Sequence, residues 1–205
     1  MKNNRTIRAV FFDVGGVCLS NGWDEASREK AASVLSLNFG EIEKRHTKYF
    51  EDLERGDLTL EDYIDDVYFT DERSFSREDV IRFMKDQSRP FESTFEVLDI
   101  LKSQGKYRLS TINNESFVLN KFRIEKFGLA RYFDSFFSSS YLHMRKPEGR
   151  IFKAVLHITA LDPDECLYID DRIENIEAAR YEGFNCIHLP DPGELKGRLK
   201  ELQII

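Results

Sequence analysis

The sequence has few cysteines and little tryptophan, and it contains no long apolar run. Three Cys and one Trp occur among 205 residues. Because Cys18, Cys166 and Cys186 are odd in number and scattered, we expect buried free thiols in a reducing compartment. No apolar run approaches membrane-spanning length, and the amino-terminal residues have no signal-peptide pattern. A cytoplasmic protein that contacts no membrane is therefore expected.

The sequence also has no excess of basic residues over acidic ones. The formal net charge is −7, and no stripe of Lys and Arg offsets it, so the composition argues against a nucleic-acid-binding protein. It does not exclude an anionic substrate, because a bound metal ion and a few cationic side chains set the local field. With 41% apolar residues, the chain can bury the core of one domain and carry a sizeable insertion.

Residues 24–87 have the pattern of a helical module. Apolar residues between Leu60 and Tyr68 recur at i, i+3, i+4, i+7 and i+8. Ser76, followed three residues later by Asp79, is typical of a helix start, and Gly56 is expected to interrupt the segment. We expect helices here and no strand.

The remainder of the chain alternates between strand and helix patterns. This alternation predicts an α/β fold with a mainly parallel sheet and right-handed crossovers. Strands are expected at 7–12, 107–112, 133–137, 166–169 and 186–189. Helices are expected at 95–101, 117–127, 151–158 and 173–181.

Polar residues follow several of the expected strands. In parallel sheets, ligands bind outside the carboxyl ends of the strands, so we expect Asp13, Asn113, Lys146 and Asp171 to converge there. An aspartate that ends a buried strand before a glycine-rich turn places a nucleophile beside backbone N–H groups. These are the parts needed to bind and attack a phosphate.

Four segments together resemble the haloacid dehalogenase superfamily. They are FFDVGGV at 11–17, KYRLSTINN at 106–114, MRKPEGRIF at 144–152 and YIDDRIENIEAA at 168–179. The resemblance covers the whole chain and implies a Rossmann-like three-layer α/β/α core formed by residues 1–19 and 89–205. It implies an all-helical cap at residues 20–88, which a hinge from Gln87 to Pro90 would let close over the site.

The resemblance implies a role for each motif residue. Asp13 would be the nucleophile that forms an aspartyl-phosphate. Mg²⁺ would be bound by Asp13, the Gly15 carbonyl and Asp171, with Asp170 and Asn175 in support. All-oxygen ligands and the lack of a Cys/His cluster favour Mg²⁺ over Zn²⁺.

Lys146 is the cation of the third motif, and the second motif supplies phosphate-binding groups. Asn113, Thr111 and Gly16 are the candidates for these groups. Counting from Gly105 puts Ile112 at the position where the family has a hydroxyl residue. A one-residue contraction of the segment puts Thr111 there instead.

Gly15 departs from the family pattern, which usually has a second aspartate here. Glycine keeps the carbonyl but has no side chain for acid–base work, a role worth about 10²–10⁴-fold in rate. His143 and Glu115 are possible replacements, although a packed histidine and a first-turn glutamate would also explain them. Trp23, His46, Tyr49 and Glu54 are candidate substrate contacts in the cap.

These features predict a Mg²⁺-dependent hydrolase, acting as a phosphatase on small phosphorylated metabolites such as sugar phosphates, and existing as a monomer or homodimer. One alternative is a weak or silent domain of this fold that binds a ligand or partner, which Gly15 supports. Another is a 2-haloacid dehalogenase-type hydrolase, against which Asp170 and Asp171 argue. A phosphonatase is disfavoured because no cap lysine is placed to form a Schiff base.

Overall fold

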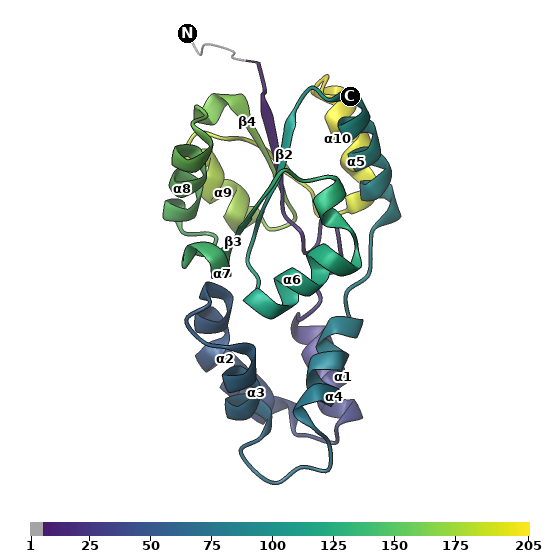
Figure 1. The fold of residues 1–205 in the computed structure, drawn as a ribbon, viewed down its shortest axis with the longest axis vertical. Helices are drawn as coiled ribbons and strands as arrows, with labels where there is room; N and C mark the ends of the chain where they lie inside the picture. The colour runs from purple at the N-terminus through teal and green to yellow at the C-terminus, as the bar shows by residue number, and fades with distance from the viewer. Residues whose placement is uncertain (1–5) are drawn as a thin grey trace.

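A five-stranded parallel sheet is the centre of the molecule. The computed structural model describes residues 6–205. The strands lie in the order β3-β2-β1-β4-β5, so the first strand is central (Figure 1). Their bounds are β1 Ala9–Phe12, β2 Arg108–Asn113, β3 Ser135–Ser138, β4 Cys166–Asp170 and β5 Asn185–His188.

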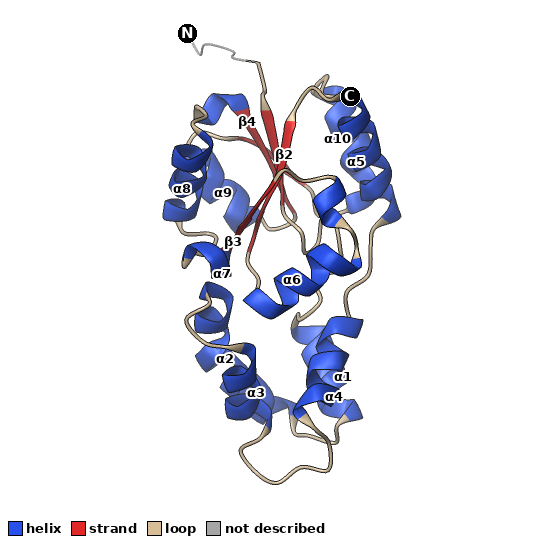
Figure 2. Ribbon diagram, in the orientation of Figure 1, coloured by secondary structure: helices blue, strands red, loops and turns tan. Residues whose placement is uncertain are grey.

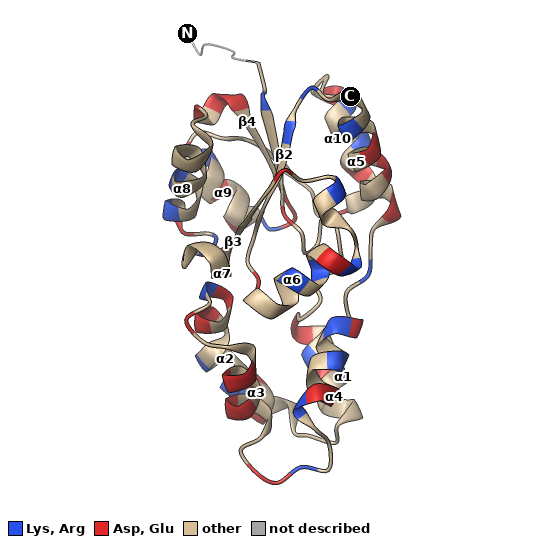
Figure 3. Ribbon diagram, viewed as in Figure 1, with Lys and Arg blue, Asp and Glu red and all other residues tan. Residues whose placement is uncertain are grey.

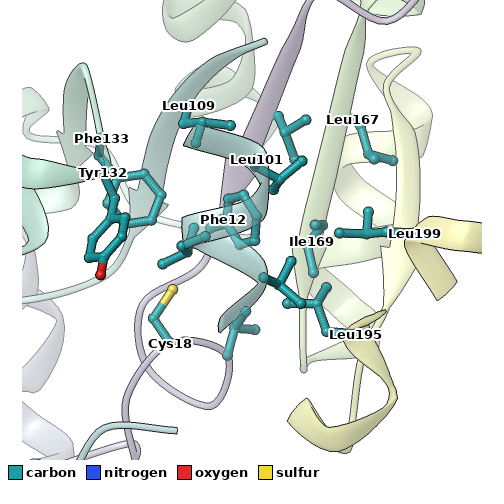
Figure 4. Close-up of a cluster of buried hydrophobic side chains, with 14 of the residues drawn as sticks. Phe12, Cys18, Leu101, Leu109, Tyr132, Phe133, Leu167, Ile169, Leu195 and Leu199 are labelled. Carbon is teal, nitrogen blue, oxygen red and sulfur yellow. The ribbon is translucent and has the colours of Figure 1, made fainter. Parts of the chain in front are cut away.

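Helices cover both faces of the sheet, as Figure 2 shows. Side chains alternate along β1, so Phe12 faces one helical layer and Phe11 the other. On one face α5 (Glu92–Gln104) and α10 (Leu195–Glu201) bury leucines around Phe12 (Figure 4). On the other face lie α8 (Gly149–Thr159) and α9 (Ile173–Tyr181). The expected three-layer α/β fold is confirmed.

Four helices lie together at one end of the molecule, beyond the end of the sheet where β1 leads into residue 13 (Figure 1). They enclose an apolar cluster of their own, to which the helix α6 (Phe117–Lys126) adds Leu119. Gly56 ends α2 in the left-handed conformation, and Ser76 with Asp79 forms a capping box at α4, as expected. The helices are α1 Glu25–Val34, α2 Phe39–Arg55, α3 Leu60–Tyr68 and α4 Arg77–Asp86.

The two segments that connect these helices to the sheet run side by side. The N–H of Ser20 donates to the carbonyl of Arg89 over 2.8 Å, and the N–H of Phe91 donates to the carbonyl of Cys18 over 3.0 Å. The chain therefore enters and leaves the helical segment at one place. The division into a core of residues 1–19 and 89–205 and a cap of residues 20–88 is our proposal.

Shorter elements complete the fold. The helix α6 ends before Gly128, whose φ is 62°, and α7 leads to the segment that carries Lys146. Their bounds are α6 Phe117–Lys126 and α7 Ser139–Leu142, with 3₁₀ turns η1 Leu129–Arg131, η2 Pro163–Glu165 and η3 Pro192–Glu194.

Some expectations need correction. The strand expected at 133–137 is observed at Ser135–Ser138, and the N–H of Phe133 donates instead to the carbonyl of Leu129 in the preceding turn. All three cysteines are free, but Cys186 is only half-buried, because it lies on the edge strand β5.

Figure 3 shows both signs of charge on α1, α2 and α4, whereas the charged residues of α3 are all acidic. Within residues 6–205, no helix has the length and apolar character needed to cross a bilayer.

Candidate active site

Asp13 lies at the carboxyl end of the central strand and is 7% exposed. Its N–H donates to the carbonyl of Ile169 over 2.8 Å, which continues the pairing of β1 with β4. One carboxylate oxygen accepts from the N–H of Val14 at 2.7 Å. The strand therefore delivers a fixed carboxylate to the edge of the sheet.

Lys146 is buried between two carboxylates. Its Nζ lies 2.9 Å from Asp13 Oδ1 and 2.7 Å from Asp170 Oδ2, and it also donates to the Tyr168 hydroxyl at 3.0 Å. Burial lowers its pKa, but the two carboxylates outweigh burial and raise the pKa overall. Lys146 is therefore a permanent positive charge beside Asp13.

The backbone of Lys146 is held by a residue that the sequence analysis did not single out. The side chain of Asn114 accepts from the N–H of Lys146 at 2.8 Å and donates to its carbonyl at 2.9 Å. Asn114 follows β2, so this pair of bonds ties the Lys146 segment to the end of that strand. The two adjacent asparagines at 113 and 114 were the only sequence signal for this role.

Asp170 has hydrogen-bond donors on both carboxylate oxygens. Besides Lys146, it accepts from the Asn175 side chain, at 3.1 Å to each oxygen, and from the N–H of Arg172 at 2.8 Å. Burial alone would raise its pKa, but Lys146, the Tyr168 hydroxyl and the N–H of Arg172 lower it overall. Asp170 is therefore an ionised, fully engaged group that orients Lys146.

Asp171 is different, because its Oδ1 is buried and has no hydrogen-bond partner among the described residues. The other oxygen lies against Gly16: a Cβ added at Gly16 would be 2.3 Å from Asp171 Oδ2. Gly16 also has a φ of 77°, which side chains rarely adopt. Only glycine at position 16 lets the turn approach Asp171 this closely.

Three carboxylates lie close together, and two of them contact the Lys146 ammonium group. Oxygen atoms of Asp13, Asp170 and Asp171 all lie within 4.8 Å of one another. Burial, followed by the charges of Asp170 and Asp171, raises the pKa of Asp13 to about 8, although Lys146 opposes the rise. An excess of negative charge, an unpartnered Asp171 oxygen and oxygen-only donors together fit a hard divalent cation such as Mg²⁺.

A cavity of about 580 Å³ opens beside this cluster. Asp13, Gly15, Lys146, Asp171 and Asn175 line it from the sheet side. Arg28, Glu43, His46 and Glu54 line it from the helices opposite, and Trp23 from the loop before α1. The structure therefore brings together residues that the sequence places more than 150 positions apart.

Two of the predicted phosphate-binding residues lie deeper than the cavity wall. Thr111 and Asn113 are buried, and neither is among the cavity-lining residues. In the described part of the chain, neither the Thr111 hydroxyl nor Asn113 Oδ1 has a hydrogen-bond partner, while Asn113 Nδ2 donates to Asn120 at 3.0 Å. Ile112 packs in the apolar cluster that contains Phe11, away from both.

Of the four candidate substrate contacts among residues 20–88, some line the cavity and one does not. Trp23, His46 and Glu54 line the cavity, whereas Tyr49 does not. His46 Nδ1 lies 2.8 Å from the Tyr63 hydroxyl, and burial, with the charge of Arg28, lowers its pKa to about 4. His46 is therefore a neutral group in the wall of the cavity.

The two possible replacements for the missing acid have different surroundings. His143 is exposed, pairs with Asp57 at 2.9 Å, and lies outside the residues that line this cavity. Glu115 is buried and lines the cavity, paired with Arg123 at 2.9 Å. Arg123 was not expected to matter, because an arginine in a helical pattern usually faces solvent.

Comparisons with known proteins agree with this architecture. A family model of haloacid dehalogenase-like hydrolases matches residues 7–183. A D-ribitol-5-phosphate phosphatase of Bacteroides thetaiotaomicron is 26% identical over 194 residues, which is 87% of this chain and 89% of the relative. Drimenol cyclase drtB of Aspergillus calidoustus is 24% identical over 96% of this chain, but the chain spans only 36% of that cyclase.

Solved structures show the same fold. The magnesium complex of the haloacid dehalogenase family enzyme bt-2542 from Bacteroides thetaiotaomicron superposes with a TM-score of 0.81 at 24% identity. The superposition covers 96% of this chain and 99% of that one. Since the family model spans most of the sequence, the chain belongs to the haloacid dehalogenase-like hydrolases.

Proposed function

We propose that this hydrolase is a Mg²⁺-dependent phosphatase of small phosphorylated metabolites, with Asp13 as its nucleophile. The observation that carries the proposal is the pairing of Asp13 with the buried Lys146 at the cavity floor, next to the unpartnered oxygen of Asp171. The similarity to a relative named as a sugar-alcohol phosphate phosphatase supports the same class of substrate.

Each residue of the proposed site has a separate role in phosphoryl transfer. Asp13 attacks phosphorus and forms an aspartyl-phosphate, which water then hydrolyses. The Lys146 ammonium offsets charge between two anions, the carboxylate and the phosphoryl group. Thr111, Asn113 and the turn at Gly16 are our candidates for holding phosphoryl oxygens; the Thr111 hydroxyl and Asn113 Oδ1 have no partner within residues 6–205, although neither residue lines the cavity.

The carboxylate cluster also accounts for a metal requirement. Asp13, Asp171 and the Gly15 carbonyl would hold Mg²⁺, which supplies positive charge to the transferring phosphoryl group. Asp170 would act indirectly, because its oxygens are already occupied by Lys146, Asn175 and Arg172.

The cavity favours a small polar substrate. Its volume of about 580 Å³ is in the range of sites for small molecules, which is roughly 300–1,000 Å³. Charged and hydrogen-bonding side chains of the helices, including Arg28 and Glu54, face this space. A metabolite with hydroxyl groups beside its phosphate would find partners there.

The test is phosphate release over a panel of sugar and polyol phosphates, with Mg²⁺ or with EDTA. Asp13→Asn is expected to lower kcat by at least about 10³-fold, as loss of a nucleophile does in other enzymes. Asp99→Asn, which changes an exposed aspartate on α5, is the matched control and should leave the rate unchanged. Equal rates in wild type and Asp13→Asn would sink the nucleophile assignment.

EDTA separates the alternatives. Loss of activity in EDTA that Mg²⁺ restores is expected for the proposed site. Turnover of a haloacid that EDTA does not affect would instead indicate carbon–halogen hydrolysis. Thermal stabilisation by ligands without any turnover would indicate a binding domain.

A further inference from the structure

The proposed phosphatase reaction leaves one proton unassigned. When the bond from phosphorus to the substrate oxygen breaks, an alkoxide leaves, and alkoxides are poor leaving groups unless they are protonated. Gly15 has no side chain to supply this proton, and Lys146 is held charged between Asp13 and Asp170. The donor must therefore be sought among the other titratable groups that line the cavity.

Most of those groups are unsuited to the task. Glu43 is held by Arg28 through two short hydrogen bonds of 2.6 and 2.7 Å, which lower its pKa. His46 is neutral and bonded to Tyr63. Asp24 and Glu25 are exposed to solvent at the start of α1, so they are not held in position to donate a proton to the leaving oxygen.

Glu54 is also engaged away from the sheet. Its carboxylate accepts from Arg145 at 2.6 and 3.0 Å, and this contact joins α2 to the segment that follows α7. Asp171 belongs to the carboxylate cluster that fits a metal ion. Among the acidic residues lining the cavity, Glu115 is the remaining carboxyl group on the sheet side.

Glu115 stands where the strand β2 ends, next to the strand that carries Asp13. Its Oε1 accepts from the N–H of Ser116 at 3.0 Å, and its Oε2 lies 2.9 Å from Arg123 Nη1. Both groups are almost completely buried, with side-chain exposures of 10% for Glu115 and 5% for Arg123. The carboxyl group is therefore fixed in position at the wall of the cavity.

The same pair lies beside the vacant side-chain position of Gly15. A Cβ built on Gly15 would be 3.8 Å from Arg123 Nη1 and 3.1 Å from Asn21 Oδ1. Gly15 is also absent from the glycines with positive φ, so its backbone does not require glycine. The space that a side chain at position 15 would enter is bordered by Arg123, the partner of Glu115.

We propose that Glu115 is the general acid and general base of this enzyme, in place of a side chain at position 15. In the first step, Asp13 forms a bond to phosphorus, the bond to the leaving oxygen breaks, and the Glu115 carboxyl proton moves to that oxygen. In the second step, a water oxygen attacks phosphorus, and the Glu115 carboxylate takes the proton that this water loses. This releases phosphate, frees Asp13 and returns Glu115 to its protonated form.

The surroundings of Glu115 are compatible with both protonation states. Burial raises its pKa most, Arg123 opposes the rise, the charge of Glu54 adds to it, and the net direction is upward. A phosphate ester entering the cavity brings further negative charge and favours the protonated acid. Arg123 then stabilises the carboxylate that forms when the proton leaves.

Arg123 is a positioning residue with a second set of contacts. Its Nη2 donates to the carbonyl of Asn21 at 2.9 Å, and its Nε donates to the Ser88 hydroxyl at 3.1 Å. Asn21 and Ser88 belong to the two segments that connect α1–α4 to the sheet. The orientation of Glu115 therefore depends on the arrangement of those segments.

The experiment compares two kinds of leaving group in the Glu115→Gln variant. Gln keeps the length of the side chain, but its single carbonyl oxygen can accept from only one of Arg123 and Ser116, so the Tm of the variant is measured first to establish that it folds. With an alkyl phosphate, kcat should fall by about 10²–10⁴-fold. With p-nitrophenyl phosphate, whose leaving group needs no proton, the first step should keep its rate while hydrolysis of the intermediate slows. A burst of one nitrophenolate per site and an accumulated aspartyl-phosphate are expected.

Two further variants make the result decisive. Glu115→Asp keeps a carboxyl group and should react with the alkyl phosphate at least tenfold faster than Glu115→Gln. Glu182→Gln changes a mostly buried glutamate, paired with Lys153 at 3.4 Å outside the cavity lining, and should behave as wild type.

Several outcomes would overturn the proposal. One is a rate of the first step that falls equally with both leaving groups in Glu115→Gln. Another is a wild-type rate in Glu115→Gln. The third is that Glu115→Gln and Glu115→Asp react with the alkyl phosphate at equal rates. The proposed function fails in a different way, because wild type itself would then release no phosphate from any compound of the panel.

Discussion

Replacing Lys146 by methionine should destabilise the protein strongly in the absence of metal. Lys146 is the one cation among the described residues that contacts both Asp13 and Asp170. Its side chain is 1% exposed, so water does not replace the lost charge. Methionine fills a similar volume, which makes the change mainly one of charge.

The size of the loss follows from the burial of the group. Removing one partner of a buried ion pair costs about 3–5 kcal/mol, because the remaining charge stays desolvated. For a chain of this length, 1 kcal/mol shifts Tm by roughly 2–4 °C. Lys146→Met should therefore lower Tm by on the order of 10 °C.

The loss should depend on pH in a defined direction. Burial and its neighbours raise the folded-state pKa of Asp13 above the unfolded value of 3.8, to about 8. A raised folded pKa means that stability falls as pH rises between those values. Without the ammonium, this pKa rises further, so the variant should lose more stability at pH 8 than at pH 5.

Thermal unfolding in EDTA, followed by circular dichroism, measures the effect. Wild type, Lys146→Met, Asp170→Asn and the double variant form a cycle, in which a coupling of roughly 0.5–3 kcal/mol is expected for contacting groups. Lys121→Met is the matched control, since Lys121 is exposed and pairs with Glu125 at 3.9 Å; it should cost less than about 0.5 kcal/mol. A Lys146→Met variant as stable as wild type, or an additive cycle, would refute the reasoning.

Two further predictions concern the turn after β1 and the cavity wall. Gly16→Ala should destabilise the protein by more than the roughly 1–2 kcal/mol of a left-handed alanine, because its Cβ would also meet Asp171 at 2.3 Å. Gly105→Ala, with φ of 58° and open space around it, should show only the left-handed cost in denaturant unfolding; equal losses would argue against the close approach. His46, with a folded pKa of about 4 against 6.5 unfolded, contributes stability that is present above pH 6.5 and lost as pH falls toward 4. The loss is at most about 3 kcal/mol, and His46→Gln should flatten the pH profile of Tm in that window; an unchanged slope would contradict the assigned burial effect.

The sequence by itself determined most elements of the fold, though not α7 or α10, and the convergence of Asp13, Lys146 and Asp171, though Asn113 lies deeper than the cavity wall. Apolar periodicity gave helices and strands within a few residues of their observed bounds, because the burial of each element is set by its own pattern of side chains. Parallel pairing brings strand ends to one edge of a sheet. Asp13, Lys146 and Asp171 could therefore be placed together from local patterns and one topological rule.

The tertiary structure alone decided which of the candidate acids lies at the cavity. His143 and Glu115 were equally available in the sequence, but only Glu115 turns into the cavity, because Arg123 from α6 holds it there. Arg123 gave no sequence signal and Asn114 only its place beside Asn113, since their partners lie on distant segments. A pattern along the chain reports which side chains are buried, whereas the partner that each buried polar group finds depends on how the segments pack.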